Sequence, residues 1–271
     1  LPTGEIEINV DQLNILNKSK TPPFTIENDT DGGDELRMKY RYLDIRRDEI
    51  KNNLLLRNKL SLETRKYLNN IDFIEVETPY LIKSTPEGAR DFIVPSRMNS
   101  GQFYALPQSP QTFKQLLMVG GMDKYYQIVK CFRDEDLRAD RQPEFTQLDI
   151  EMSFIDQNYV IAVIEKLFEE IFLEVLDFKI NLPIERITYS DSMDRFGSDR
   201  PDMRIPFEIK NINNIVKDCE FKVFSDPASQ DGKKVSALCI PSEAKLSRRD
   251  IDLYTDIAIS KGSQGLAYIK C

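Results

Sequence analysis

The spacing of apolar residues predicts two long helices. Residues 48–69 are rich in Leu, Lys, Arg and Glu and contain neither Gly nor Pro, which is typical of a helix. Residues 158–176 place apolar side chains at the helical period, at positions 161, 164, 167, 168, 171, 172 and 175. Each helix therefore has an apolar face that can pack against a sheet or another helix.

A shorter helix is predicted over residues 109–120. Ser109 suits the N-cap, Pro110 the first helical position, and a Gly pair ends the segment. Gln111 and Lys114 are three residues apart, so they share a face that is separate from the apolar one. A solvated helix face explains this polar pair as readily as a binding site does.

Alternating polar and apolar positions predict several strands. Residues 73–78 alternate strictly before Pro79 ends the run, and residues 5–10 alternate as well. Beyond Pro206 the pattern changes to short strands at 221–224 and 235–240, followed by a helix near 247–260. The mixture of helices and strands predicts an α+β chain.

The most informative segment is a predicted hairpin over residues 125–155, with a charged loop at 134–143. On the return strand, one apolar face is predicted to hold Thr146, Leu148, Ile150, Met152 and Phe154, while Gln147, Asp149, Glu151 and Ser153 point the other way. Gln127 and Arg133 share one face of the outgoing strand. If the two polar faces coincide, the hairpin presents an arginine, two carboxylates and two amides. A hairpin with one solvated face is the alternative.

This set of side chains suits a nucleotide or a zwitterion. Arginine can bind a phosphate through two parallel hydrogen bonds, and carboxylates can hold Mg²⁺ or a substrate ammonium. The chain contains no histidine, which excludes a Ser-His-Asp triad, a Cys-His pair and a His-ligated metal within these residues. Catalysis here must use carboxylates, Arg, Lys and amides.

Composition is that of an ordinary globular protein. The chain has 271 residues, of which 41% are hydrophobic and 30% charged, with a formal net charge of −8. An acidic chain gains no general attraction to nucleic acid, so RNA contacts must come from local basic patches. The four cysteines are far apart and form no CxxC pair, which favours reduced thiols over zinc or disulfides. No apolar run approaches the roughly 20 residues of a membrane span.

The strongest basic patch covers residues 37–47, with five basic residues and two tyrosines in eleven positions. It could contact RNA, or its arginines could form a surface ion-pair network. The pattern leaves both interpretations open.

Several segments together resemble class II aminoacyl-tRNA synthetases. Phe132-Arg-Asp-Glu, the loop, and Arg141-Gln-Pro-Glu-Phe resemble motif 2 of that class, and residues 132–150 are similar to the bacterial and mitochondrial type of aspartyl enzyme. Residues 73–80 resemble motif 1. Residues 84–97 resemble the loop over the amino-acid pocket, residues 105–118 the substrate-binding helix, and the segment from Phe221 onward the insertion domain.

The resemblance implies a role for each matching residue. It implies ATP binding by Arg133, Asp134, Glu135, Gln142 and Phe145, with Arg133 and Glu135 catalytic and Phe145 stacked on adenine. It implies aspartate binding by Glu87, Gln111, Lys114, Arg133 and Asp149, with Lys114 at the side-chain carboxylate and Glu87 and Asp149 at the α-ammonium. It also implies Pro79 at a dimer interface and Arg138 and Arg141 near the tRNA acceptor end. No metal ligand is assigned among the side chains.

The resemblance also implies a domain order and an activity. We expect residues 1–20 to be the trailing edge of an anticodon-binding domain, residues 21–205 the first part of the catalytic antiparallel sheet with its flanking helices, and residues 206–271 part of the insertion domain. The implied activity is aspartate–tRNA ligation with ATP and Mg²⁺, in a homodimer that binds tRNA-Asp and no membrane. The expected compartment is a bacterial cytoplasm, or alternatively the mitochondrial matrix.

Motif 3, the remaining part of the class II site, has no counterpart in the chain, so we expect the chain alone to be inactive. Two alternatives to the aspartyl enzyme stay open. One is an asparaginyl-tRNA synthetase, although the cation at Lys114 favours an acidic substrate side chain. The other is a non-catalytic tRNA-binding paralogue on the same fold.

Overall fold

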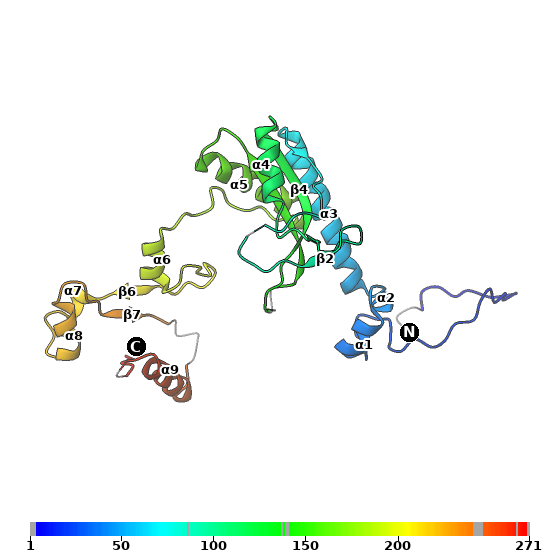
Figure 1. Cartoon of the computed structure of the whole chain (residues 1–271). Helices are drawn as coiled ribbons and strands as arrows, with labels where there is room; N and C mark the ends of the chain where they lie inside the picture. Colours follow the sequence, from blue (N-terminus) through cyan, green and yellow to red (C-terminus); the bar gives the residue numbers. More distant parts are fainter. Residues whose placement is uncertain are drawn as a thin grey trace. The chain divides into compact units, whose positions relative to one another are not determined.

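The computed structural model describes residues 4–85, 87–136, 138, 141–240, 246–263 and 265–269. The chain divides into two compact units, Leu1–Ile184 and Glu185–Cys271 (Figure 1). Each unit has its own helices and its own small sheets. The family domain boundaries expected at residues 20 and 205 stay predictions.

The first unit is built on a three-stranded sheet with the order β1-β4-β5. Strand β4 (Lys124–Phe132) pairs antiparallel with β5 (Glu144–Met152), which confirms the predicted hairpin and its loop. Strand β1 (Ile74–Glu75) lies parallel to β4 and is shorter than the predicted strand 73–78. After β1 the Val76 N–H still donates to the Tyr126 carbonyl, at 3.2 Å, and Pro79, which has no N–H, follows three residues later.

Two long helices cover the apolar face of this sheet. They are α3 (Asp48–Asn70) and α5 (Gln157–Leu176), and both match the predicted segments closely. The core joins Leu68 of α3, Tyr126 of β4 and Val163 of α5, with Ile150 and Met152 of β5 packed against it. Phe154 does not belong to this face, contrary to the alternation pattern. It follows β5 with a φ of 56° and is 98% exposed, because the strand has already ended at Met152.

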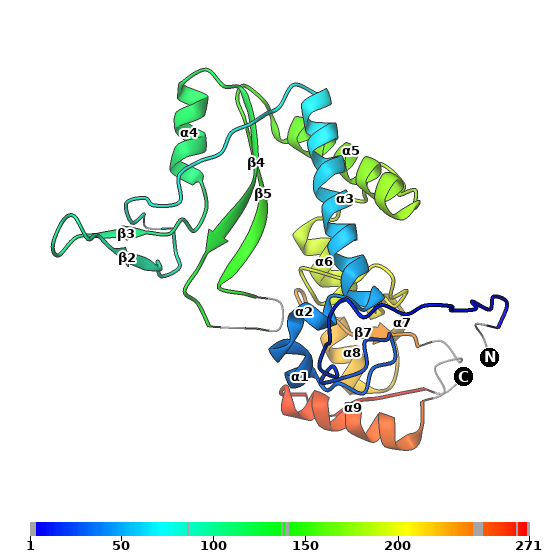
Figure 2. The ribbon, with the colours of Figure 1, turned by 90° about the vertical axis from the view of Figure 1, so that its right-hand side faces the viewer.

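Helix α4 (Gln111–Val119) lies on the other side of the hairpin from α3 and α5 (Figure 2). A two-stranded antiparallel ribbon of β2 (Ile93–Pro95) and β3 (Phe103–Ala105) precedes it. The N-cap of α4 is Pro110 and not Ser109, so the prediction was wrong by one residue. The Ser109 hydroxyl instead donates a hydrogen bond to the Glu87 carboxylate.

The N-terminal segment holds two short helices, α1 (Asp34–Lys39) and α2 (Arg41–Asp44). Residues 6–10 form no strand, so that prediction was wrong. Their apolar side chains Ile6, Ile8 and Val10 are more than 60% exposed, and an isolated alternating segment has no neighbouring strand with which to pair. Phe24, by contrast, is buried against Gly32, where an added Cβ would lie 2.9 Å from the Phe24 side chain.

The second unit begins with α6 (Tyr189–Phe196) and continues through a ribbon of β6 (Ile209–Asn211) and β7 (Ser236–Leu238). Between these strands lie α7 (Asn213–Val216) and α8 (Lys222–Ala228), so the predicted strand at 221–224 is wrong. Phe221 and Phe224 are one helical turn apart, and their rings meet edge to face at 5.1 Å. Helix α9 (Arg248–Ser260) confirms the predicted last helix and starts with a Ser247–Asp250 capping box.

Within the parts of the chain that the structure describes, no helix is both long and apolar enough to span a bilayer.

Candidate active site

The candidate site lies on the face of the β4–β5 hairpin that is turned away from α3 and α5. The strand register pairs Gln127 with Asp149 and Cys131 with Phe145. Because paired residues of an antiparallel ladder point to the same side, the polar faces of the two strands coincide as predicted. The hairpin and helix α4 thus enclose a set of charged and amide side chains.

Lys114 is the central cation of the site. It projects from α4, and its ammonium Nζ lies 2.9 Å from Asp149 Oδ1 and 3.3 Å from Glu151 Oε2 on strand β5. The side chains of Lys114 and Asp149 are only 11% and 10% exposed, which is rare for charged residues unless they are paired.

Burial acts on both members of this pair. Burial raises the pKa of Asp149, and this outweighs the lowering effect of the Lys114 ammonium. For Lys114, burial opposes the charged form, but the hydrogen bonds and charges of Asp149 and Glu151 together raise its pKa. Lys114 therefore carries its positive charge at neutral pH and makes the ionised form of Asp149 tolerable in a buried position.

The second carboxylate oxygen of Asp149 has unused hydrogen-bonding capacity. Among the described residues, Asp149 Oδ2 is buried and lacks a hydrogen-bond partner. An unsatisfied buried carboxylate oxygen costs free energy that a bound donor would recover. A ligand ammonium beside Asp149 fits this position.

Cys131 marks the middle of the site. Its thiol is buried and lies 3.1 Å from Oε1 of Gln147, to which it donates. Burial raises the pKa of Cys131 to about 11, and the charges of Arg133, Asp149, Glu87 and Lys114 all act on it. The four charged residues predicted from the sequence thus lie close enough to Cys131 for their charges to affect its pKa. A thiol with so high a pKa does not serve as a nucleophile at neutral pH.

Glu87 approaches the site on the loop before β2. Its carboxylate oxygen Oε2 accepts a hydrogen bond of 2.7 Å from the Ser109 hydroxyl, and its charge raises the pKa of Asp149. Gly88 follows with a φ of 100°, a conformation that disfavours any residue with a Cβ. The carboxylates of Glu87 and Asp149, both expected to bind the substrate ammonium, are therefore close enough to affect each other electrostatically.

Arg133 and Phe145 form a second subsite at the loop end of the hairpin. The guanidinium carbon of Arg133 lies 5.1 Å from the centroid of the Phe145 ring, within cation–π range. Both side chains are half-buried. A planar aromatic face beside a guanidinium offers a stacking surface for a nucleobase and a bidentate contact for a phosphate.

The hairpin loop holds exposed charges. Glu135 pairs with Arg141 at 3.4 Å, and the backbones of Arg138 and Arg141 form an isolated antiparallel bridge. The Asp134 N–H donates to the Arg90 carbonyl at 3.0 Å, which ties this loop to the loop of Glu87. Arg138 and Arg141 are both exposed.

The remaining predicted residues lie at the edges of this arrangement. Gln142 and Pro79 are exposed, whereas Gln111 is half-buried at the first position of α4, one turn before Lys114. Their assigned contacts with substrate or with a second subunit stay predictions.

Several side chains of the site were not assigned a role from the sequence. Ser109 and Gln108 hold the Glu87 loop, Gln147 receives the Cys131 thiol, and Glu151 shares the Lys114 ammonium. The alternation of β5 had already placed Gln147 and Glu151 on the polar face. No sequence signal marked Gln108, because its partners, the Ala89 backbone and the Asp91 carboxylate, lie 17 to 19 residues away.

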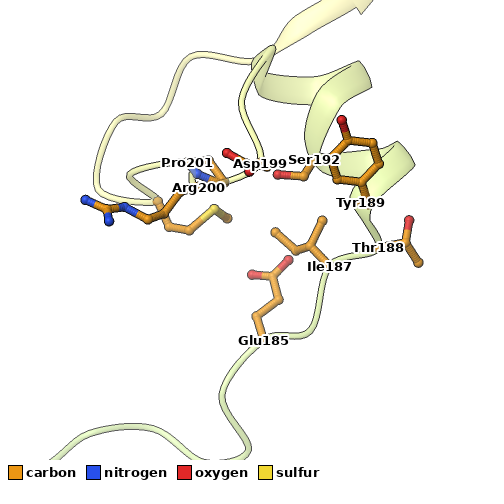
Figure 3. A pocket seen from close by; sticks show the side chains of 9 residues that line it. Glu185, Ile187, Thr188, Tyr189, Ser192, Asp199, Arg200 and Pro201 are labelled. Atoms are coloured by element: carbon orange, nitrogen blue, oxygen red, sulfur yellow. The ribbon is translucent and has the colours of Figure 1, made fainter. Parts of the chain in front are cut away.

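A separate cavity of about 430 Å³ lies in the second unit, before and after α6 (Figure 3). Its walls carry carboxylates and a guanidinium from Glu185, Asp199 and Arg200, together with the hydroxyl of Ser192. None of the predicted site residues lines this cavity. It therefore forms no part of the candidate active site.

Comparison with known proteins gives consistent findings. A family model described as class II tRNA synthetases (D, K and N) matches residues 33–261. An aspartate–tRNA ligase from Flavobacterium psychrophilum is 56% identical, with 100% of this chain and 46% of that protein covered. An aspartate–tRNA(Asp/Asn) ligase from Syntrophotalea carbinolica is 55% identical, with 100% of this chain and 45% of that protein covered. The chain spans under half the length of these curated relatives.

Among solved structures, a putative aspartyl-tRNA synthetase from Leishmania major Friedlin aligns with a TM-score of 0.48 and 26% identity. The alignment covers 54% of this chain and 28% of that one.

Proposed function

On the premise that this chain belongs to the class II tRNA synthetases of the D, K and N group, we propose that it forms part of an aspartate–tRNA ligase. In this proposal the whole protein activates L-aspartate with ATP and transfers the aspartyl group to the 3′ end of tRNA. The described residues supply the aspartate pocket and the arginine that grips the nucleotide.

The observation that carries the proposal is the buried pair of Lys114 and Asp149, with one carboxylate oxygen left without a partner among the described residues. L-Aspartate has an ammonium group and a second carboxylate, so it can replace each member of the pair by a group of the same charge. The substrate ammonium binds Asp149 and Glu87, and the substrate side chain binds Lys114. Such an exchange leaves no buried charge unpaired.

Activation then requires no side-chain base. An oxygen of the ionised α-carboxylate attacks the α-phosphorus of ATP, a new P–O bond forms, and pyrophosphate leaves with the electrons of the broken P–O bond. Arg133 stabilises the negative charge that develops on the α-phosphate, while Phe145 stacks on the adenine. Asp134, Glu135 and Gln142 complete the nucleotide contacts in this proposal. Mg²⁺ is proposed to bind mainly through the nucleotide phosphates, as is common in ATP sites.

The partners of the protein follow from the same proposal. The exposed Arg138 and Arg141 of the hairpin loop would contact the phosphates of the tRNA acceptor end. Pro79, exposed after β1, would lie at the interface of a homodimer. One relative is named an aspartate–tRNA ligase and another an aspartate–tRNA(Asp/Asn) ligase, and the proposal is confined to tRNA-Asp.

Lys114 also supports the proposal over the asparaginyl alternative. An asparagine side chain is neutral and would leave the buried ammonium paired only by Asp149 and Glu151. A site built around a charged partner disfavours a substrate that lacks it, because Asp149 would then have to pair with both the substrate ammonium and Lys114.

The test uses the full-length gene product that contains this chain. Lys114→Met is expected to lower kcat/KM for aspartate in ATP–pyrophosphate exchange by roughly 30- to 1000-fold, because loss of one member of a buried charge pair costs about 2–4 kcal/mol. The control is Lys66→Met, which removes a helix lysine that is paired with Glu63 at 2.8 Å on the surface. An equal effect of the two substitutions would refute the proposed role of Lys114.

A further inference from the structure

Gln108 connects two segments that surround the candidate site. It lies between β3 and α4 and is only 2% exposed. Its Oε1 accepts from the Ala89 N–H at 3.1 Å, and its Nε2 donates to the Ala89 carbonyl at 2.9 Å. The same Nε2 donates to the Asp91 carboxylate. One buried amide thus holds both backbone groups of Ala89, as a neighbouring strand would.

The clamped residue is close to Glu87. Only Gly88 separates Glu87 from Ala89, and its φ of 100° makes the turn between the two residues. Ser109, directly after Gln108, donates to Glu87 Oε2 at 2.7 Å. Two consecutive residues therefore fix the loop on both sides of Gly88, one through the backbone and one through the carboxylate.

The segment that carries Gln108 is itself anchored to the hairpin. The Phe132 N–H donates to the Pro107 carbonyl at 2.9 Å, and the Leu106 N–H donates to the Phe92 carbonyl at 2.9 Å. Phe132 is the last residue of β4, next to Arg133. The position of the Glu87 loop is thereby set relative to the strands that hold Asp149 and Arg133.

We propose that Gln108 is a positioning residue that holds Glu87 ready to receive the α-ammonium of the substrate. The inference rests on the proposed function and adds a specific requirement to it. The clamp needs a donor and an acceptor in one buried side chain, because Ala89 presents an N–H and a carbonyl while Asp91 presents a carboxylate. An amide meets this requirement, and a carboxylate of the same shape does not.

This requirement can be tested by exchanging the amide of residue 108 and the carboxylate of residue 91. In Gln108→Glu, the new carboxylate can accept from the Ala89 N–H but can donate neither to the Ala89 carbonyl nor to Asp91, and it repels both. In the double variant Gln108→Glu/Asp91→Asn, the amide introduced by the second substitution can donate to the carboxylate introduced by the first. The oxygen of that amide can still accept from the Ser84 hydroxyl, which binds Asp91 in the native protein. Asp91→Asn alone keeps a compatible arrangement, because its oxygen can face the Gln108 amide.

We expect Gln108→Glu in the full-length gene product to raise the KM for aspartate about 10- to 100-fold, the range of one or two charge-assisted hydrogen bonds. The kcat and the KM for ATP are expected to change less than about threefold. Asp91→Asn is expected to stay near the wild type. The double variant is expected to recover part of the aspartate KM, because it restores the contact between residues 108 and 91 but not the donation to the Ala89 carbonyl. A defect that the double variant does not relieve would overturn the inference, because a merely structural role predicts additive damage.

Amide hydrogen exchange of the unliganded protein supplies a second readout. Exchange at Ala89 is expected to be faster in Gln108→Glu and to return toward the wild-type rate in the double variant. Faster exchange at Ala89 with an unchanged aspartate KM would overturn the inference while leaving the proposed function intact. A folded wild type with no aspartate-dependent pyrophosphate exchange would refute the proposed function, and with it the inference.

Discussion

The buried Asp44 carboxylate explains why segment 37–47 contains so many arginines. The five basic residues of segment 37–47 fitted an RNA contact and an ion-pair network equally well from sequence. In the structure the Asp44 carboxylate is fully buried and forms ion pairs with three of these arginines. They are Arg47 at 2.9 Å, Arg37 at 3.9 Å and Arg41, which confirms the ion-pair network for these three. Arg47 also donates to the carbonyls of Glu27 and Asn28, so the network fixes the preceding loop to the start of α3.

Asp44→Asn is expected to lower thermal stability at neutral pH and to lose this effect in acid. The hydrogen bond and charge of Arg47 lower the pKa of Asp44 from 3.8, so its ionisation stabilises the fold above the unfolded-state value. That stabilisation disappears as the pH falls through the lower folded-state pKa. The difference in Tm between wild type and variant should therefore be constant above about pH 5 and shrink below about pH 4.

Thermal unfolding followed by circular dichroism between about pH 3 and pH 7 measures this difference. Asp34→Asn is the matched control, because Asp34 also pairs with Arg37 but is 90% exposed. A gap between wild type and Asp44→Asn that stays constant over the whole acid range would contradict the assignment of the effect to this carboxylate.

At the scale of elements, long periodic segments were predicted correctly, whereas two of the short ones were misread, although the short strand predicted at 235–240 was found as β7. Helices α3 and α5 and the β4–β5 hairpin were found from their spacing, because each repeats its pattern over enough residues to exclude the other period. The segments at 5–10 and 221–224 were misread, since four to six residues carry too little pattern and their state depends on neighbours that sequence does not show.

The same argument explains what was predictable in the site. Hairpin alternation placed Arg133, Gln147, Asp149 and Glu151 on one face, and the family resemblance supplied the roles of Lys114 and Glu87. The clamp of Gln108 on Ala89 could not be foreseen, because it joins a side chain to the backbone of a distant loop. Tertiary contacts of this kind follow no local period.

The pleat of β4 gives a matched pair of variants. Lys130 pairs with Thr146 on the face that is turned away from the site, whereas Arg133, directly after β4, lies over the Phe145 ring on the site face. Arg133→Ala is expected to lower kcat for pyrophosphate exchange by about 10²–10³, the usual cost of losing one group that stabilises transition-state charge. Lys130→Ala removes an exposed cation that pairs with Glu144 at 2.9 Å and should leave kcat within about twofold. Comparable losses of kcat in both variants would contradict the assignment of Arg133 to the site.

At the scale of the whole molecule, the first of the two units carries the candidate site. This unit gathers Lys114, Asp149 and Glu87 with Arg133 around Cys131, while the second unit has a separate small sheet and cavity. The chain covers under half the length of its curated relatives. The complete reaction is accordingly proposed for the full-length gene product.

The most direct test of the account is amino-acid-dependent ATP–pyrophosphate exchange by the full-length gene product. The account predicts exchange with aspartate and at least about 100-fold less with asparagine at equal concentration, since the Lys114 pocket requires a second carboxylate, and sites of this kind discriminate by about 10⁴ or more. Wild-type protein that is folded but exchanges with neither amino acid would contradict it. Exchange that is equal for both amino acids would contradict the assigned role of Lys114.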